Sequence, residues 1–392
     1  MVFFMYAYWH DARFKKSVGG PVKIYELASN LTSLGHDVYL FLPDIGYPER
    51  QTTANVIRIP FIDLPLIRFI CYQVLAYFYS LMRILKHGRP DLIYVRIMWS
   101  FIPMLLGRLF SIPVILEVND SPHRAYKGIN NRLKRQLIRL IDRISYNLSN
   151  HILPVTQGIA ENLHSIEGVP LDKLTVLPSG TNTDLFRPLD KESCCKKLGL
   201  DMRALYIGFI GTFFRHQGID TLINSAPLIV QNYPDAKFLM VGDGPMRVSW
   251  EKRVSENGLD KSFIFTGYVP YEDVPTYCGV MDVCVAPLLK EADERSLVKV
   301  FDYLACRKPV VISDIGETSS FFSESGAILT VVPEDHTSLA HGISHLLENE
   351  PLRNDMGKSG REFVCSQFSR IRIAEIVEAI ALRLQKENFE RT

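Results

Sequence analysis

The sequence has few of the features that mark metal binding, secretion or nucleic-acid binding. Its seven cysteines include no C-x-x-C pair and no Cys/His spacing of a zinc site, and an odd number of scattered thiols is typical of a reduced, cytoplasmic protein. No Asp-x-Asp occurs, so the sequence offers no candidate for a divalent-metal site built on that motif. A net charge of +1 argues against nucleic acid as a partner. No basic region precedes the apolar residues 1–9, which we predict to be a buried strand rather than a signal peptide.

Long uncharged apolar runs are also absent. The most apolar segment, 62–87, is interrupted by Arg68 and Arg83, and the run between them reaches only about 21 Å as a helix. The hydrocarbon core of a bilayer is about 30 Å thick. A second segment, 131–147, places arginines along one helical side and leucines along another. Two interpretations stay open for both segments: a peripheral position at the inner face of the membrane, or packing on the core of a domain.

Short apolar runs alternate with segments of helical period along the whole chain. The runs are continuous rather than alternating, which indicates strands buried on both faces of a parallel sheet. Both halves are therefore predicted to be α/β, doubly wound domains, joined near Phe186–Arg187–Pro188. The predicted strands are 1–9, 38–42, 91–96, 113–118, 151–156, 174–180, 206–211, 236–242, 262–267, 282–287 and 310–312.

The stretch from Glu294 to Asp302 is the most informative part of the chain. Ser296 is predicted to cap a helix over 297–306, and a helix N-terminus with its unpaired N–H groups suits a phosphate. Lys299 in the first turn opposes the helix dipole unless an anion is present. By spacing alone, the alternative of a loop acid, a solvated helix acid and an indifferent lysine stays open.

The same stretch resembles the E-x7-E signature of retaining glycosyltransferases of the GT-B type, family 4. The resemblance implies that Glu294 contacts the donor sugar, that Asp302 holds the ribose hydroxyls, and that the backbone at Leu297 and Val298 meets the diphosphate. Asp302 replaces the usual glutamate, and Arg307 replaces a glycine.

The resemblance extends over nearly the whole chain and implies the GT-B architecture of two Rossmann-like domains facing across a cleft. Residues 1–187 would form the acceptor-side domain and 188–369 the nucleotide-sugar domain, while the helix in 370–392 would return to the first domain.

Three further motifs bear on the donor. Gly19 and Gly20 match the family's glycine loop, which faces the diphosphate, and FTGYVP implies that the backbone at Tyr268 and Val269 receives the nucleobase. The family's phosphate-clamping arginine and lysine are replaced here by Thr212 and Gln217.

We predict that Arg215 supplies the missing cation beside Gln217. The alternative is that Arg215 is a solvated loop residue and the site is impaired.

On the acceptor side, the family's histidine–aspartate motif corresponds to a segment that contains Asp120 and His123, which we predict to have catalytic roles. For His123 the alternative of an ordinary loop histidine stays open. The family's reaction retains anomeric configuration, requires no metal or other cofactor, and uses the departing phosphate to assist deprotonation of the acceptor. The expected partners are a nucleoside-diphosphate sugar and a sugar or lipid-linked acceptor, in surface polysaccharide or glycolipid assembly. The alternatives are a nucleotide-sugar-binding module without catalysis, and an epimerase of the same fold, which lacks this E-x7-E wording.

Overall fold

The structure is a computed structural model that describes residues 1–7, 19–44, 51–60, 68–96, 101–120, 131–292 and 297–391. It divides into two compact units. The first comprises Met1–Ser179 and Arg370–Thr392, and the second comprises Gly180–Ser369. The sequence places the boundary at residue 187. The structure places it earlier because Thr181 bridges to Ser369 and Phe186 lies in the core of the second unit.

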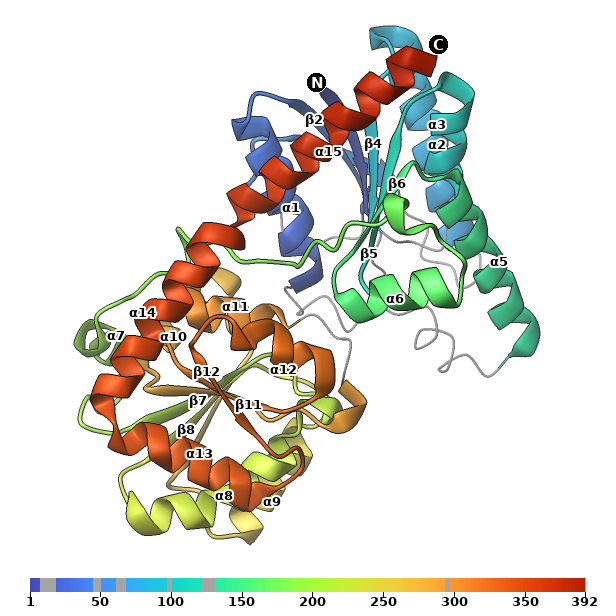
Figure 1. Cartoon of the computed structure of the whole chain (residues 1–392). Helices are drawn as coiled ribbons and strands as arrows, with labels where there is room; N and C mark the ends of the chain where they lie inside the picture. Colours follow the sequence, from blue (N-terminus) through green and yellow to red (C-terminus); the bar gives the residue numbers. More distant parts are fainter. Residues whose placement is uncertain are drawn as a thin grey trace. The chain divides into compact units, whose positions relative to one another are not determined.

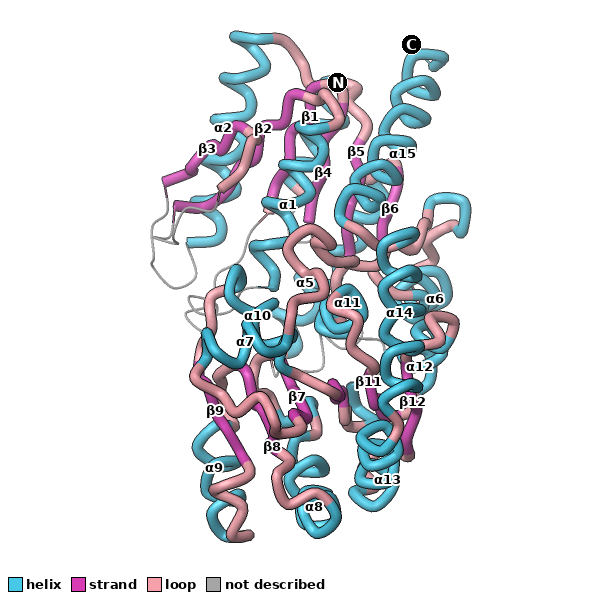
Figure 2. The backbone as a smooth tube through the Cα atoms, turned by 90° about the vertical axis from the view of Figure 1, so that its left-hand side faces the viewer, coloured by secondary structure: helices cyan, strands magenta, loops and turns pink. Residues whose placement is uncertain are grey.

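The first unit is built on a parallel six-stranded sheet in the order β3-β2-β1-β4-β5-β6, which Figure 2 shows strand by strand. Its strands are β1 (Val2–Tyr6), β2 (Asp37–Asp44), β3 (Asn55–Pro60), β4 (Leu92–Arg96), β5 (Val114–Val118) and β6 (His151–Pro154). Its helices are α1 (Gly19–Ser33), α2 (Arg68–His87), α3 (Ile102–Phe110), α5 (Arg132–Leu148), α6 (Gln157–Ser165), α15 (Arg370–Arg391) and the short η2 (Leu171–Lys173).

Alternate residues of each strand face opposite sides of this sheet and form two separate cores. Phe3 and Met5 of β1 pack with α1 and α15 on one face, and Figure 1 shows α15 lying along α1. Phe4 and Tyr6 pack with α2, α3, α5 and α6 on the other face. Along the described helices, no segment combines the length and apolarity needed to cross a bilayer.

The second unit has its own parallel six-stranded sheet in the order β12-β11-β10-β7-β8-β9. Its strands are β7 (Tyr206–Ile210), β8 (Lys237–Val241), β9 (Phe263–Gly267), β10 (Val283–Ala286), β11 (Val310–Ser313) and β12 (Ile328–Val331). Its helices are α7 (Lys191–Leu198), α8 (Ile219–Asn232), α9 (Arg247–Glu256), α10 (Val274–Val280), α11 (Val298–Ala305), α12 (Gly316–Ser323), α13 (His336–Glu348) and α14 (Glu350–Gln367), with short turns η3 (Arg215–Gln217), η4 (Tyr271–Asp273) and η5 (Lys290–Ala292).

Two doubly wound α/β units confirm the predicted fold class. The prediction of a strand over 174–180 is wrong: Leu174 makes one isolated bridge to Ile152, and no regular strand follows. The sequence also missed β3 and β12. Both are edge strands that remain partly exposed, so their apolar runs are weaker than those of the central strands.

Candidate functional site

The order of strands in the second sheet reverses between β7 and β10, which are neighbours although β8 and β9 lie between them in sequence. In doubly wound sheets, ligands bind beyond the carboxyl ends of the strands at such a reversal. The loop after β7 (211–218) and the segment that connects β10 to α11 leave the sheet at this edge.

These two segments approach each other closely because Gly218 lies between them. Its φ is +68°, and a Cβ added there would lie 1.7 Å from the carbonyl oxygen of Pro287. Beside it, the Leu289 N–H donates a hydrogen bond to the carbonyl oxygen of His216 at 3.2 Å. A residue with a side chain at position 218 therefore cannot be accommodated without moving one of the two segments.

The turn V-G-D-G at 241–244 braces the β7 loop from the other side. The Gly211 N–H donates to the Val241 carbonyl at 3.0 Å, and the Phe213 N–H donates to the Asp243 carbonyl at 2.9 Å. Its position shows an architectural contribution to the shape of the edge.

Lys299 extends from the first turn of α11 toward the β7 strand and loop. Its Nζ lies 4.0 Å from the ring centroid of Phe209 and donates a hydrogen bond to Oε1 of Gln217. The side chain is half-buried, and the crowding of protein atoms around the ammonium lowers the pKa of Lys299 to about 7. Among the described residues, Lys299 forms no ion pair. Two residues predicted separately for the donor site, Gln217 and Lys299, are thus brought into contact.

The start of α11 differs in detail from the sequence prediction. The helix begins at Val298 with Leu297 as the N-cap residue, and Leu297 supplies no side-chain hydrogen bond. Ser296, the predicted cap, lies outside the described residues, as does Glu294, the predicted contact to the donor sugar.

Asp302 lies one turn further along α11 and is 8% exposed. Its Oδ1 accepts a hydrogen bond from the hydroxyl of Thr181, whose backbone N–H donates to the Phe368 carbonyl at 2.9 Å. The carboxylate is therefore held in a defined position. Its role toward ribose hydroxyls stays a prediction.

The other predicted donor residues of this unit follow strands β7 and β9. Arg215 is exposed in η3. Tyr268, which is 42% exposed, and Val269, which is 8% exposed, come directly after β9 at the same edge of the sheet.

In the first unit, strand order reverses between β1 and β4. Gly19 and Gly20 begin α1, the helix that follows β1, and the exposed Asp120 follows β5. All three lie on segments at the carboxyl edge of the sheet. His123, the second residue predicted for the acceptor side, lies outside the described residues.

A buried ionic network at this edge was missed by the sequence analysis. Lys23 of α1 donates to Glu117 of β5 at 2.8 Å, and both are almost fully buried. The hydroxyl of Tyr94 also donates to Glu117, and Arg96 Nε lies 3.8 Å from the same carboxylate. Arg96 in turn donates to Asn119 at 3.2 Å, next to Asp120. A glutamate inside the otherwise apolar run PVILEV was the available signal, because a buried carboxylate requires partners.

Burial and charge act in opposite directions on this network. Burial raises the pKa of Glu117, but Lys23 and Arg96, together with hydrogen bonds from Lys23 and Tyr94, lower it to about 2 overall. Burial lowers the pKa of Lys23 to about 8 despite the neighbouring Glu117. Both groups are ionised at neutral pH, so the network is a fixed charge pair that links α1 to β5.

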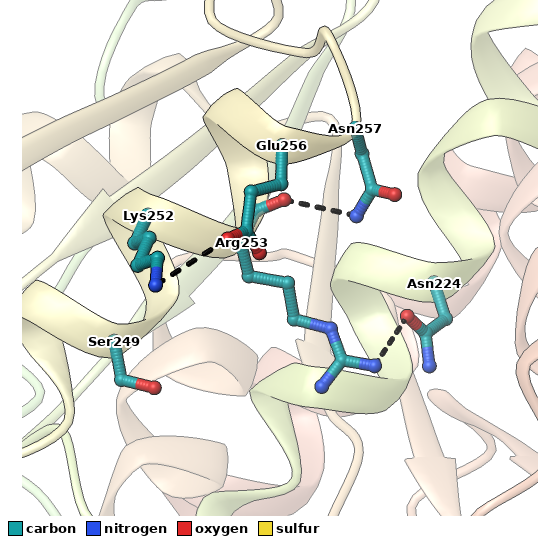
Figure 3. Close-up of a pocket in the computed structure, with 6 residues that line it drawn as sticks. All are labelled: Asn224, Ser249, Lys252, Arg253, Glu256 and Asn257. Atoms are coloured by element: carbon teal, nitrogen blue, oxygen red, sulfur yellow. Dashed lines mark hydrogen bonds and ion pairs between the residues drawn. The ribbon is translucent and has the colours of Figure 1, made fainter.

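The hollow shown in Figure 3 lies between α8 and α9 and has a volume of about 440 Å³. Its lining residues are Asn224, Ser249, Lys252, Arg253, Glu256 and Asn257. Their polar groups are largely bonded to one another: Arg253 donates to Asn224 at 3.0 Å and Asn257 donates to the Arg253 carbonyl at 2.9 Å. None of the predicted site residues lines this hollow.

In comparisons with known proteins, each of the two units matches a glycosyltransferase family model. The family model "Glycosyltransferase Family 4" matches residues 19–185, and the model "Glycosyl transferases group 1" matches residues 190–363. Together they span most of the sequence.

Two relatives that align over most of the chain are distant in sequence. The chain is 24% identical over 370 residues to 2-deoxystreptamine glucosyltransferase of Streptomyces kanamyceticus, covering 88% of this chain and 94% of the relative. It is 20% identical to alpha-monoglucosyldiacylglycerol synthase of Acholeplasma laidlawii, covering 95% of each. Anabaena HepE, solved in complex with UDP-glucose, superposes with a TM-score of 0.75 at 14% identity, covering 97% of this chain and 99% of HepE.

Proposed function

The chain belongs to the group 1 glycosyltransferases with the GT-B fold, and from this premise we propose that it transfers a sugar from a nucleoside-diphosphate sugar to a hydroxyl acceptor with retention of configuration. The observation that carries the proposal is the Lys299–Gln217 contact at the strand reversal of the second sheet. The contact holds an ammonium group at the edge of the sheet where doubly wound sheets bind ligands. No described carboxylate pairs with this ammonium.

On the donor side, the backbone at Leu297 and Val298 would meet the diphosphate, and Asp302 would accept hydrogen bonds from the ribose hydroxyls. The backbone at Tyr268 and Val269 would receive the base, for which uracil is our first candidate because the Anabaena neighbour holds UDP-glucose. Glu294 would contact the donor sugar.

We propose that transfer proceeds without a metal ion. The sequence contains no Asp-x-Asp, so protein groups are left to stabilise the departing nucleoside diphosphate. The departing phosphate would assist removal of the proton from the acceptor hydroxyl on the same face of the sugar. Retention requires that the product have the anomeric configuration of the donor, which NMR coupling constants of the product measure directly. Turnover that depends on added Mg²⁺ and stops with EDTA would contradict the metal-independent mechanism.

The acceptor would bind at the first unit, beside the segments that carry Gly19, Gly20, Asp120 and His123. A sugar or a lipid-linked hydroxyl in surface polysaccharide or glycolipid assembly fits this proposal, since one relative over the whole chain is a synthase of a glycosylated diacylglycerol.

Exposed leucines on α5 support a peripheral position at the inner face of the membrane. Leu133, Leu137 and Leu140 are 77%, 57% and 55% exposed, whereas the buried side of α5 carries Ile138 and Tyr146. The apolar stripe therefore faces away from the core, and exposed arginines on the same helix, Arg132 and Arg135 among them, suit anionic lipid.

The membrane proposal is tested by co-sedimentation with vesicles of phosphatidylglycerol and phosphatidylcholine at low salt. Leu133→Gln/Leu137→Gln should weaken binding, and Val248→Gln, an equally exposed apolar position on α9, should not. Equal binding of wild type and double variant, or no binding of either, contradicts the proposal.

The donor proposal is tested by calorimetry with UDP, GDP and ADP. Asp302→Ala should weaken binding of the preferred nucleotide, while Glu324→Ala, an exposed acid after α12, should leave it unchanged. If wild type binds none of the three, the donor site is refuted.

Catalysis is tested separately, because the neutral Thr212 and Gln217 favour a second candidate, a nucleotide-sugar-binding module without turnover. Transfer by the wild type that Glu294→Gln abolishes, with nucleotide binding kept, excludes that module. Binding without turnover of any donor supports it.

A further inference from the structure

The ammonium of Lys299 is set up to receive an anion. It lies over the face of Phe209 and donates one of its three N–H groups to Gln217. No described carboxylate forms an ion pair with it. The space around it is defined closely, since a Cβ added at Gly211, where φ is +149°, would lie 3.1 Å from Nζ. Among the described residues, none accepts a hydrogen bond from the other two donors of the ammonium.

The β7 loop positions this cation with an uncharged side chain, that of Gln217. Gln217 accepts from Lys299 through Oε1, and its Nε2 lies 3.2 Å from Nε2 of His216. His216 in turn stacks on Phe214 with ring centroids 5.7 Å apart, and this stacking holds the imidazole that contacts Gln217. Arg215, by contrast, is exposed in the same turn.

We propose that Lys299 is the cation that receives the donor's diphosphate and that Gln217 positions it from the β7 loop. The inference rests on the proposed function and assigns to Lys299 the role that the sequence prediction gave to Arg215. Its substrate class is the nucleoside diphosphate common to all sugar donors of this type.

Proton uptake follows from the surroundings of the ammonium. Burial holds the pKa of Lys299 at about 7, so the group is mostly neutral at pH 8 in the free protein. A diphosphate beside it favours the charged form and raises its pKa. The titratable and charged groups on neighbouring segments are His216 and Arg215 of η3, Lys290 and Glu291 of η5, and Asp302 of α11. Donor affinity should therefore fall as pH rises above 7.

The experiment is calorimetry of UDP, GDP and ADP at pH 8, in HEPES and in Tris, on the full chain. For the nucleotide that binds wild type most tightly, Lys299→Gln should lose about 10- to 150-fold in affinity, as expected for a charge-assisted phosphate contact. The nucleoside without phosphates should bind both proteins equally. The binding enthalpy of the wild type should differ between the buffers by the uptake of nearly one proton, and this difference should vanish in Lys299→Gln.

Matched variants separate the outcomes. Lys261→Gln removes an exposed lysine at the opposite edge of the sheet and should change nothing. The exchange Gln217→Lys/Lys299→Gln returns an ammonium to the same contact and should regain most of the affinity.

The proposal is overturned if Lys299→Gln keeps wild-type affinity, if it loses affinity for the nucleoside equally, or if Arg215→Gln has the larger effect. It is also overturned if the exchange variant folds but stays as weak as Lys299→Gln. Absence of nucleotide binding in the wild type refutes the proposed function itself, and the inference with it.

Discussion

Replacing Glu117 by glutamine should destabilise the first unit by about 3–5 kcal/mol at neutral pH, because it leaves the Lys23 ammonium buried without a counter-charge. The two pKa shifts of the pair show why the intact network contributes little net free energy to folding. The lowered pKa of Glu117, about 2 against an ordinary 4.5, favours folding by about 3 kcal/mol. The lowered pKa of Lys23, about 8 against 10.5, opposes it by a similar amount.

The pH dependence gives this prediction a sign. The folded-state pKa of Lys23 lies below its unfolded value, so the unfolded state binds more protons between pH 8 and 10.5 and stability rises with pH across that window. Without Glu117, which raises the pKa of Lys23, the window extends downward into the neutral range. The penalty of Glu117→Gln should therefore be larger at pH 6 than at pH 10.

Hydrogen exchange detected by mass spectrometry reads the two units separately. Peptides from β4 and β5 should lose protection in Glu117→Gln, while peptides from β7 and β8 act as the internal reference. The apolar variant Lys23→Met/Glu117→Leu/Tyr94→Phe should recover most of the protection, because well-packed apolar groups replace a buried pair at little cost. Equal loss at pH 6 and pH 10, or a loss below about 1 kcal/mol, would refute the reasoning.

Other consequences of the structure are open to simple measurements. Gly218→Ala should abolish nucleotide binding, because its Cβ has no room; unchanged calorimetric affinity would contradict the close approach of the two loops. Burial, and then Arg383, lower the pKa of His151 to about 4, so the folded state resists its protonation, and stability should fall by about 3 kcal/mol as pH drops from 6.5 to 4. His151→Asn should flatten that slope in urea unfolding curves. Thr181→Val should cost about 1–3 kcal/mol by removing the donor to the buried Asp302 carboxylate, with the thermal midpoint of the second unit as the measure.

The sequence predicted the central strands of both sheets because they are apolar on both faces and end at turn residues. It missed the edge strands β3 and β12, which are partly exposed, although it found the edge strands β6 and β9. The N-terminus of α11 was displaced because helix caps depend on local geometry that residue type alone does not determine.

For the site, the sequence indicated individual residues but not the contacts between them. Gln217 and Lys299 could be chosen from their motifs, but their contact depends on β7 and β10 being neighbours, which is a property of sheet topology. The Lys23–Glu117 pair joins a helix to a strand 94 residues away, and only the isolated charge in an apolar strand hinted at it.

The membership of α15 in the first unit has a consequence for synthesis. Ile373, Val377, Ala381 and Leu384 complete the core that α1 and the first sheet begin, yet they are synthesised only after the whole of the second unit. The second unit is continuous in sequence, so it can finish folding while the first still exposes an apolar face. A chain released early, before residue 370, would carry one finished unit and one with an uncovered core, which makes such fragments substrates for chaperones and proteases.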